Sequence, residues 1–408
     1  MTTENQAHIP TGWKECELGA VIVEKAKSTI KVSEAANFGE FPFFTSGDNI
    51  LLHDEKIIEG ENLFLATGGV ANIKYFDGDA AYSTDTFVVS TNGEANAKYL
   101  YYYLLSKVGY INKNYFEGSG LKHLQKKDFR KHVFVLPTSP TEQQKIASIL
   151  SKFDEAINQT EQLIVKYKKI KEGLMHDLLT RGIDEQGNIR SEETHKFKDS
   201  PLGRIPVEWE CDEIGNVCYV TKLSGFEFTK YMEYREDGEI IAIRAMNIKN
   251  EKLILDDVQR ISKRVSEFLV RSKLYAGDIL ITYIGAYIGD ILQIKEDDKY
   301  HLAPNVAKIV AGNKLKPDFL EFMMRSANVQ RFIKSLVTTT ANPSLTMGQI
   351  RTVFVIYPQD KNEQYRIHQR LLSLNELIST TSSDLEKLYL QKFGLMHDLL
   401  TGKVRVQI

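Results

Sequence analysis

The sequence predicts an α+β protein in which two domains are separated by an antiparallel pair of long helices that form a coiled coil. The main observation is an internal repeat. The octapeptide Gly-Leu-Met-His-Asp-Leu-Leu-Thr occurs at residues 173–180 and again, unchanged, at 394–401. A second motif, Ile-Pro-x-x-Trp, opens each half at residues 9–13 and 205–209. Two copies are too few for a solenoid. They suit a single chain that imitates a two-fold dimer, so we expect an internal pseudo-two-fold repeat.

The bulk composition is that of an ordinary globular protein. A length of 408 residues predicts two or three domains, and a hydrophobic content of 42% supports packed cores rather than disorder. The three cysteines, Cys16, Cys211 and Cys218, match neither a disulfide framework nor a usual zinc spacing, which favours a reducing compartment. The longest apolar stretch, residues 279–289, is far shorter than the ~20 residues that cross a bilayer. Since no secretion signal is found either, we expect a cytoplasmic protein without a membrane partner.

The charge distribution leaves nucleic-acid binding open. A formal net charge of −2 argues weakly against it, because DNA-binding domains usually carry a basic surface. Each half nevertheless has one locally basic segment, at residues 107–132 and 260–273. A solvated surface explains such runs equally well.

Capping signals predict two long helices over residues 139–183 and 359–402. Ser139 can cap the first helix, Pro140 suits its first turn, and Glu142 stands where a capping box requires it. Asp360 and Glu363 repeat the arrangement in the second copy, and Gly182 and Gly402 supply the stop signals. Between and after the helices we expect a linker at residues 184–204 and a tail at 403–408.

Each predicted helix carries one apolar stripe, and the other helix is its expected partner. Pseudo-two-fold pairing would make the helices antiparallel and place the two globular domains at opposite ends. Gly173 and Gly394 interrupt the helices at a cost of about 1 kcal/mol each relative to Ala. Close backbone approach, contact with another chain or plain packing would each explain them. The residues expected to pair the helices are Ile146, Phe153, Ile157, Leu163, Ile170, Leu174, Ile367, Leu374, Ile378, Leu388 and Leu395.

The globular segments, residues 1–138 and 205–358, contain short β-like runs and shorter helical stretches. Trp13 and Trp209 are expected to anchor the two cores, and His176 and His397 to be framework residues. The frame of each half, meaning its opening motif and its long helix, repeats, whereas the globular sequence between them diverges almost completely. Such identical frames around different globular sequences predict modules whose specificity can be exchanged on a fixed scaffold.

Several loops of both segments are rich in glycine, hydroxyl, amide and charged groups, which suit base edges or phosphates. Turn-forming loops use the same residue types, so each contact is a hypothesis. In the first segment the candidates are Thr45, Ser46, Gly47, Asp48, Thr67, Gly68, Gly69, Tyr82, Ser83, Thr84, Ser119, Lys122, His123, Gln125 and Lys126. In the second they are Arg244, Asn247, Tyr283, Gly285, Tyr287, Thr338, Thr339, Asn342, Ser344 and Thr346. We find no candidate catalytic or metal-binding residues.

The whole chain resembles the specificity subunit of Type I restriction-modification enzymes. The resemblance rests on the repeated Ile-Pro-x-x-Trp opening, on the repeated octapeptide, and on Pro followed by Glu-Gln at the entry to each long helix. These last residues are Pro137 with residues 142–143, and Pro358 with residues 363–364. The stretch Phe-Phe-Thr-Ser-Gly at residues 43–47 is also similar to one common in such recognition domains.

The resemblance implies two target-recognition domains, residues 1–138 and 205–358, each of which reads one half of a bipartite, asymmetric sequence in double-stranded DNA. The paired helices would set the unspecified gap and dock two methyltransferase subunits, which methylate an adenine in each half-site. Restriction subunits would join for translocation and cleavage. S-adenosylmethionine, Mg and ATP are expected in these partner subunits, and this chain would be a non-catalytic recognition subunit without a cofactor. The resemblance transfers no individual base contact.

Two alternatives compete with this interpretation. A stand-alone DNA adenine methyltransferase would explain Phe-Glu-Gly-Ser-Gly at residues 116–120, which matches a Phe-x-Gly-x-Gly cofactor loop. However, the preceding segment is polar, and Ala-Pro-Asn-Val at residues 303–306 is not the Asn-Pro-Pro-Tyr-like motif of such enzymes. A coiled-coil interaction protein without DNA binding is the other alternative. It predicts no steep salt dependence of DNA affinity, whereas phosphate contacts require one.

Overall fold

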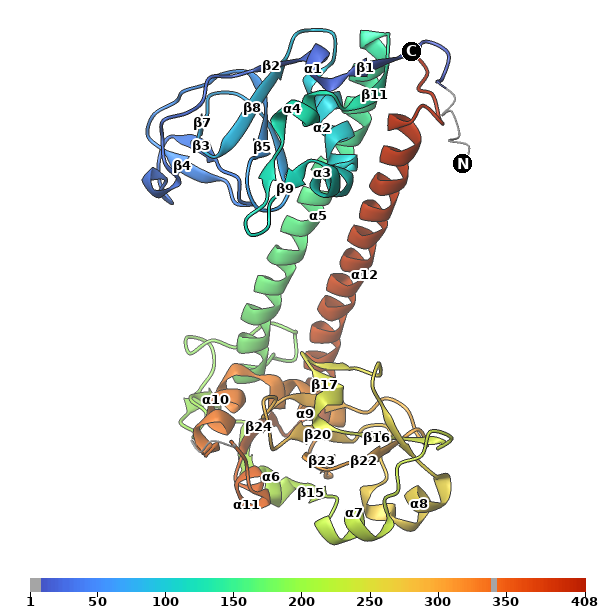
Figure 1. Cartoon of the computed structure of the whole chain (residues 1–408). Helices are drawn as coiled ribbons and strands as arrows, with labels where there is room; N and C mark the ends of the chain where they lie inside the picture. The colour runs from blue at the N-terminus through green and yellow to red at the C-terminus, as the bar shows by residue number, and fades with distance from the viewer. Residues whose placement is uncertain (1–8, 339–342) are drawn as a thin grey trace. The chain divides into compact units, whose positions relative to one another are not determined.

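The computed structural model describes residues 9–338 and 343–408 (Figure 1). The chain divides into two compact units: residues up to Leu163 together with Thr381–Ile408, and Ile164–Thr380. The division falls inside the two long helices, α5 (Pro140–Thr180) and α12 (Lys361–Leu400). Each unit therefore contains one globular domain and a part of both helices. The mixture of helices and strands confirms the predicted α+β class.

The first globular domain is built on a four-stranded and a three-stranded sheet. The four-stranded sheet has the order β2-β8-β5-β6 and is antiparallel throughout. In the second sheet, β3 pairs antiparallel with β4 and parallel with β7. The elements are β1 (Trp13–Glu17), α1 (Leu18–Val21), β2 (Ile22–Glu24), η1 (Val32–Glu34), β3 (Phe41–Phe44), β4 (Leu51–His53), β5 (Glu61–Ala66), β6 (Ile73–Asp77), β7 (Ala81–Tyr82), β8 (Thr86–Thr91), α2 (Ala97–Ser106), α3 (Val108–Asn114), β9 (Phe116–Glu117), β10 (His123–Leu124), α4 (Lys126–Arg130) and β11 (Val133–Pro137).

The second globular domain repeats these two sheets, although its sequence differs. The order β15-β23-β20-β21 matches the four-stranded sheet, and β16 pairs antiparallel with β19 and parallel with β22. The elements are β12 (Phe197–Lys198), β13 (Ile205–Pro206), β14 (Trp209–Glu213), α6 (Ile214–Val217), β15 (Cys218–Lys222), α7 (Gly225–Tyr231), β16 (Ile240–Ile243), η2 (Ala245–Asn247), β17 (Ile248–Lys249), β18 (Lys252–Leu253), β19 (Gln259–Ile261), α8 (Lys263–Phe268), η3 (Val270–Ser272), β20 (Ile279–Thr282), β21 (Ile291–Gln293), β22 (Tyr300–Leu302), β23 (Val306–Ala311), α9 (Pro317–Arg325), α10 (Ala327–Leu336), α11 (Met347–Arg351) and β24 (Phe354–Pro358).

The repeated tryptophan and proline of each half are paired in the structure. Trp13 on β1 lies opposite Pro137 on β11, and Trp209 on β14 lies opposite Pro358 on β24. Each long helix begins shortly after this proline, so the two-stranded ladder joins a domain to its helix. Both indoles belong to the buried cores of their units, which confirms the predicted anchors.

The repeated octapeptide is part of the same cores. Leu399 and Leu400 at the end of α12 are buried against the first domain. Leu178 and Leu179 at the end of α5 are buried against the second. Burying a leucine side chain contributes roughly 1.5–3 kcal/mol. Each helix thus ends in the core of the domain that precedes the other helix, which explains why the octapeptide is needed twice.

The helices pair antiparallel in the first unit. Lys392 of α12 forms an ion pair with Asp154 of α5, and the hydroxyl of Tyr389 donates to Glu161 at 2.5 Å. As residue numbers rise along α5, those of the facing residues on α12 fall. In the second unit, Ile367 of α12 belongs to the same core cluster as the end of α5.

The pairing face differs partly from the predicted one. Leu163 and Ile170, expected in the seam, are 37% and 44% exposed, and Ile164 is buried instead. Adjacent positions lie about 100° apart on a helix, so the run Leu163-Ile164-Val165 fits more than one face. Of the other predicted residues, Ile146, Ile157 and Ile367 are buried, and those that are partly buried are Phe153, Leu174, Leu374, Ile378, Leu388 and Leu395.

Glycines follow both helices where the stop signals predicted them. Gly182 and Gly402 have φ values of +63° and +70°, a conformation that disfavours other residues. Both helices are shorter than predicted and end at Thr180 and Leu400.

Across residues 9–338 and 343–408, none of the helices has the length and apolar character needed to span a membrane.

Candidate nucleic-acid interface

Four loops occupy equivalent places in the two domains. We call them loops A to D and define each one by the strand or helix beside it. Loop A follows β3 or β16 (residues 45–48 and 244–247), and loop B follows β5 or β20 (67–70 and 283–287). Loop C follows β7 or β22 (83–85 and 303–305), and loop D precedes α4 or α11 (118–125 in the first domain, and the described residues 338 and 343–346 in the second). Because β3 and β7, like β16 and β22, are parallel neighbours, loops A and C leave the same edge of their sheet.

In the first domain, hydroxyl groups tie loops A, B and C together. The Ser46 hydroxyl donates to the Asp85 carbonyl and accepts from the Thr67 amide at 3.0 Å. The Thr67 hydroxyl donates to the same Asp85 carbonyl at 2.6 Å. Three segments that are far apart in the sequence therefore meet at one place.

Loop D joins this cluster through the backbone. The Gly69 amide donates to the Lys122 carbonyl at 2.8 Å, and the Leu124 amide donates to the Thr67 carbonyl at 3.0 Å. Gly68 and His123 form an isolated bridge between the loops. Loops A to D of the first domain thus meet in one region.

Burial separates the first-domain candidates into two groups. Thr45, Tyr82 and Ser83 are buried, and the Tyr82 hydroxyl donates to the Ala26 carbonyl at 2.6 Å. These three side chains build the loops and do not face solvent. The exposed candidates are Gly47, Asp48, Ser119, Lys122 and His123, and the partly exposed ones are Ser46, Thr67, Gly68, Gly69, Thr84, Gln125 and Lys126.

Two lysines near the loops act within the protein. The Lys126 ammonium pairs with Glu24 at 3.0 Å and lies 4.3 Å from the centre of the Phe87 ring. The Lys74 ammonium donates to the carbonyls of Thr45 and Gly47 and so supports loop A. Burial lowers the pKa of both lysines. Lys74 was missed by the sequence analysis, since a single lysine inside a β-like run gives no signal of this role.

In the second domain, loops A, B and C line a cavity of about 350 Å³. Arg244 from loop A, Gly285 and Tyr287 from loop B, and Asn305 from loop C form its walls. Asn305 has a φ of +72°, which is uncommon outside glycine. The sequence of residues 303–306 gives no local signal for a binding role of Asn305, because its position beside loops A and B depends on the fold.

Several second-domain candidates are engaged within the protein. Asn247 is buried and donates to the carbonyls of Ile254 and Asp257 at 2.9 and 2.8 Å. Arg244 pairs with Asp257 at 3.0 Å and keeps a side-chain exposure of 23%. Tyr283 is buried, whereas Gly285 and Tyr287 are exposed.

The described part of loop D also reaches loop B in this domain. Ser344 and Ile284 form an isolated bridge, and the Leu345 amide donates to the Tyr283 carbonyl at 2.9 Å. Thr346 caps α11 by accepting from the Gln349 amide at 3.1 Å. Thr338 is exposed and Ser344 partly buried. The remaining candidates, Thr339 and Asn342, lie outside the described residues.

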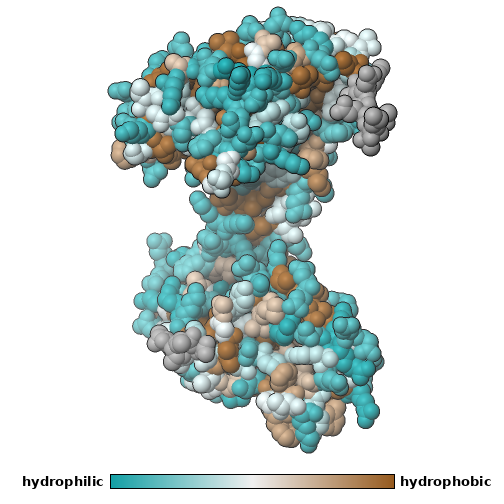
Figure 2. All heavy atoms as spheres, viewed as in Figure 1, coloured by the Kyte–Doolittle hydropathy of each residue, from teal (hydrophilic) through white to brown (hydrophobic). Residues whose placement is uncertain are grey.

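Nearby carboxylates pair with basic side chains in the predicted basic segment of the second domain. Arg271 pairs with Glu227 at 2.6 Å and Lys273 with Asp298 at 2.6 Å, so part of the positive charge of residues 260–273 is balanced locally. Figure 2 shows a mostly hydrophilic visible face on the first domain.

Among the residues that the structure describes, no group of three or more His, Cys, Asp or Glu side chains could hold a metal ion.

Comparison with known proteins decides the family. Residues 10–167 and 206–388 match the family model of the Type I restriction modification DNA specificity domain. The chain belongs to this family. The two matched segments correspond to the two repeats, so the chain carries two specificity domains.

Individual relatives agree with the family. The specificity subunit of the Type I restriction enzyme MjaVIII from Methanocaldococcus jannaschii is 26% identical over 98% of this chain and 94% of that protein. The crystal structure of a Type I restriction-modification S subunit from M. genitalium has the same fold, with a TM-score of 0.65, 16% identity and 98% coverage of both chains. A chain from a structural study of complex assembly and conformational transition of the type I R-M system has a TM-score of 0.55 and 15% identity, and covers 97% of this chain and 99% of that one.

Proposed function

We propose that this chain is the DNA-recognition subunit of a Type I restriction-modification complex, in which each domain reads one half of a bipartite site. One observation carries the proposal: two domains of the same topology bring four equivalent loops to one place but present different side chains there. Lys122 and His123 are exposed at the first set of loops, and Arg244 and Tyr287 stand at the second. Such groups can contact phosphates and the base edges of the major groove.

The unspecified gap between the half-sites would be set by α5 and α12. Each helix connects to one domain through a β-ladder and ends in the core of the other domain. A pair of about 40-residue helices is roughly 60 Å long at 1.5 Å per residue. Half-site spacing on DNA follows the spacing of the protein elements that read it.

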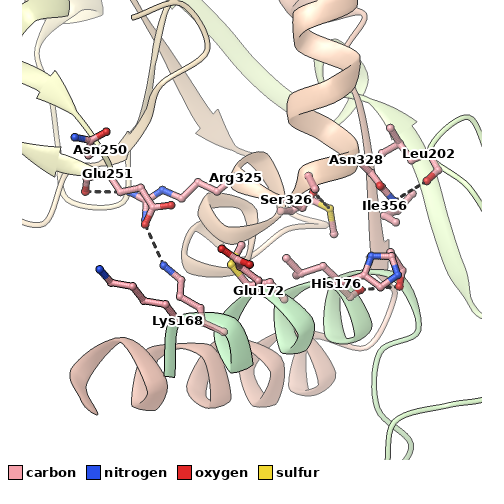
Figure 3. Close-up of a pocket in the computed structure, with 16 residues that line it drawn as sticks. Lys168, Glu172, His176, Leu202, Asn250, Glu251, Arg325, Ser326, Asn328 and Ile356 are labelled. Atoms are coloured by element: carbon pink, nitrogen blue, oxygen red, sulfur yellow. Dashed lines mark hydrogen bonds and ion pairs between the residues drawn. The ribbon is translucent and has the colours of Figure 1, made fainter. Parts of the chain in front are cut away.

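Two equivalent grooves beside the octapeptides are candidate docking places for two methyltransferase subunits. The groove in the second unit has a volume of about 700 Å³ and is lined by Met175, His176, Leu179 and Thr180 (Figure 3). The groove in the first unit has a volume of about 660 Å³. Its lining includes the matching octapeptide residues Met396, His397, Leu400 and Thr401. Two grooves that share these four octapeptide residues suit two copies of one partner.

The walls opposite the octapeptides differ between the grooves. In the second unit, Arg325, Ser326 and Asn328 face the helix, and Lys171 pairs with Glu251 at 3.3 Å (Figure 3). His176 and His397, expected to be framework residues, are exposed in the grooves. Of the two, the groove in the first unit is the more apolar, because Val133, Val135 and Phe393 contribute to it.

The helix glycines support contact with another chain. A Cβ at Gly173 or Gly394 would meet no described atom within 4 Å, so close approach inside this chain does not explain them. Replacing either glycine by tryptophan should therefore leave folding intact and weaken capture of the methyltransferase subunits. Pull-down from cells that coexpress them would measure the effect, with Gly225→Trp on α7, an open position that lines neither groove, as the control. Capture that stays at the wild-type level would make these glycines incidental.

In this proposal the chemistry belongs to the partners. S-adenosylmethionine would be bound by the methyltransferase subunits, and Mg and ATP would serve the restriction subunits. The chain itself would supply sequence recognition and geometry.

The decisive experiment is to map N6-methyladenine in cellular DNA with and without this chain, together with its methyltransferase subunits. We expect a bipartite, non-palindromic motif that disappears when the chain is absent. A continuous motif, or a motif that persists without the chain, would contradict the proposal.

A further inference from the structure

Each long helix begins with a buried carboxylate. Glu142 in the first turn of α5 is 1% exposed, and Glu363 in the first turn of α12 is 4% exposed. Each accepts a hydrogen bond from the indole N–H of the tryptophan that opens its half, at 3.4 Å from Trp13 and 3.3 Å from Trp209. The domain strand and its own helix therefore meet at one carboxylate.

The positive partner of each carboxylate comes from the segment that follows the other helix. Arg405, which follows α12, donates to both oxygens of Glu142 at 2.6 and 2.8 Å. Arg190, which follows α5, donates to both oxygens of Glu363 at 2.5 and 3.0 Å. Such bidentate pairs fix direction as well as distance.

The two arginines do not stand at equivalent places in the repeat. Arg405 closely follows Gly402, whereas the turn formed by the Ile183–Ile189 bridge separates Arg190 from Gly182. Segments of different length thus bring the same side chain to the same carboxylate. The shared requirement is the Trp–Glu–Arg contact itself, which we call the joint.

We propose that Arg190 and Arg405 are positioning residues that hold each recognition domain in register with the helix pair. This inference rests on the proposed function, because the helix pair is taken to set the gap between half-sites. Each joint connects three parts of one unit: the strand that carries the tryptophan, the beginning of the domain's own helix and the segment that follows the other helix. Opening a joint frees the recognition domain to shift relative to the helices, so the gap loses definition while the half-site sequences are still read.

Arg405 is the better residue for the test. Its side chain is 41% exposed, against 10% for Arg190, so removing it disturbs less of the core. It also lies 5.9 Å from the centre of the Trp13 ring and donates to the Thr11 carbonyl at 2.5 Å. Lys403 in the same segment pairs with Asp398 at 3.3 Å and provides a matched control.

Tryptophan fluorescence tests the joint directly, because the two tryptophans of the chain stand one in each joint. In the full chain carrying Trp209→Phe, Arg405→Ala should raise acrylamide quenching of Trp13, and Arg405→Lys should raise it less. Lys403→Ala should leave it unchanged. The same comparison with both tryptophans present replaces this one if Trp209→Phe does not fold. Equal quenching in Arg405→Ala and wild type would overturn the joint.

Methylation mapping tests the effect on the gap. The full chain is coexpressed with its methyltransferase subunits, and N6-methyladenine is mapped in the genomic DNA of the host. For Arg405→Ala we expect the half-sites of the wild type, methylation at gaps one base pair longer or shorter, and a tenfold to ~100-fold loss of rate at the preferred gap. Arg405→Lys should restore part of the selectivity.

The outcomes separate the two proposals. A wild-type chain that directs no bipartite methylation contradicts the proposed function. A wild type with a defined gap and an Arg405→Ala variant with the same defined gap contradict only the role of the joint.

Discussion

At the scale of single residues, the loop side chains divide into those that build the loops and those that face outward. Thr45, Ser83 and Asn247 are buried. The side chains of Thr45 and Asn247 accept from backbone amides of loop A, and the Ser83 hydroxyl bonds with the Thr86 hydroxyl. Lys122 and His123 are exposed. Substitutions in the first group should therefore act through folding, whereas substitutions in the second should act through DNA binding.

Lys122 gives the simplest test of this division. If its ammonium contacts a phosphate, Lys122→Ala should weaken binding of all duplex sequences and reduce the slope of log affinity against log salt by about 1. The measurement is fluorescence anisotropy of labelled duplex DNA across a salt series. Lys127→Ala, which removes another exposed lysine in α4, serves as the control. An unchanged slope for Lys122→Ala would place that residue outside the interface.

A second residue-scale prediction concerns pH. His132 lies between the hydroxyls of Tyr103 and Tyr115, at 2.9 and 3.0 Å, and burial lowers its pKa from 6.5. Below pH 6.5 the unfolded chain binds a proton that the folded chain does not. The free energy of unfolding should therefore decrease as the pH falls below 6.5, until the lowered pKa is reached. Urea unfolding between pH 5 and 8 should show a smaller decrease for His132→Gln, and an identical decrease would contradict this role.

At the scale of elements, the helices could be predicted well and the loops only in part. Capping residues and glycines located both long helices, because these signals are local. The prediction of the buried face differs from the structure at Leu163 and Ile170, which are exposed. Where apolar residues are adjacent, tertiary packing determines which of them is buried. Loop composition indicated where the candidates are. Which of them point outward depends on long-range hydrogen bonds, such as that from Thr67 to Asp85, that no local pattern contains.

The helix pair makes a prediction of its own. In the first unit Glu161 faces Tyr389, so a heptad inserted after Glu161 should be matched by one inserted before Tyr389. Seven residues add about 10 Å to the helix pair, which is about three base pairs at 3.4 Å per base pair. Methylation mapping should show the same half-sites with a gap about three base pairs longer. A heptad in α5 alone breaks the facing contacts and should abolish methylation. A matched pair of insertions that leaves the gap unchanged would refute the proposal that α5 and α12 set the gap.

At the scale of the whole molecule, the repeat combines a fixed frame with variable contents. Trp13, Pro137 and Glu142 make the same contacts as Trp209, Pro358 and Glu363. Between them, the two domains share their strand order but differ in loop chemistry. The repeat in the sequence predicted the frame. It did not reveal the arginine joints, because Arg190 and Arg405 stand at different distances from the octapeptide.

This organisation predicts that one domain can be exchanged without disturbing the other. The natural boundaries are Trp13 and Pro137, which are paired across β1 and β11, so this pair and the contact of Trp13 with Glu142 would be kept. Replacing residues 14–136 by the corresponding segment of another family member should change one half-site completely. The second half-site and the gap should remain, because the second domain, α5 and α12 are unaltered. Methylation mapping of the exchanged chain measures all three features at once, and a change in both half-sites would show that the domains do not read DNA independently.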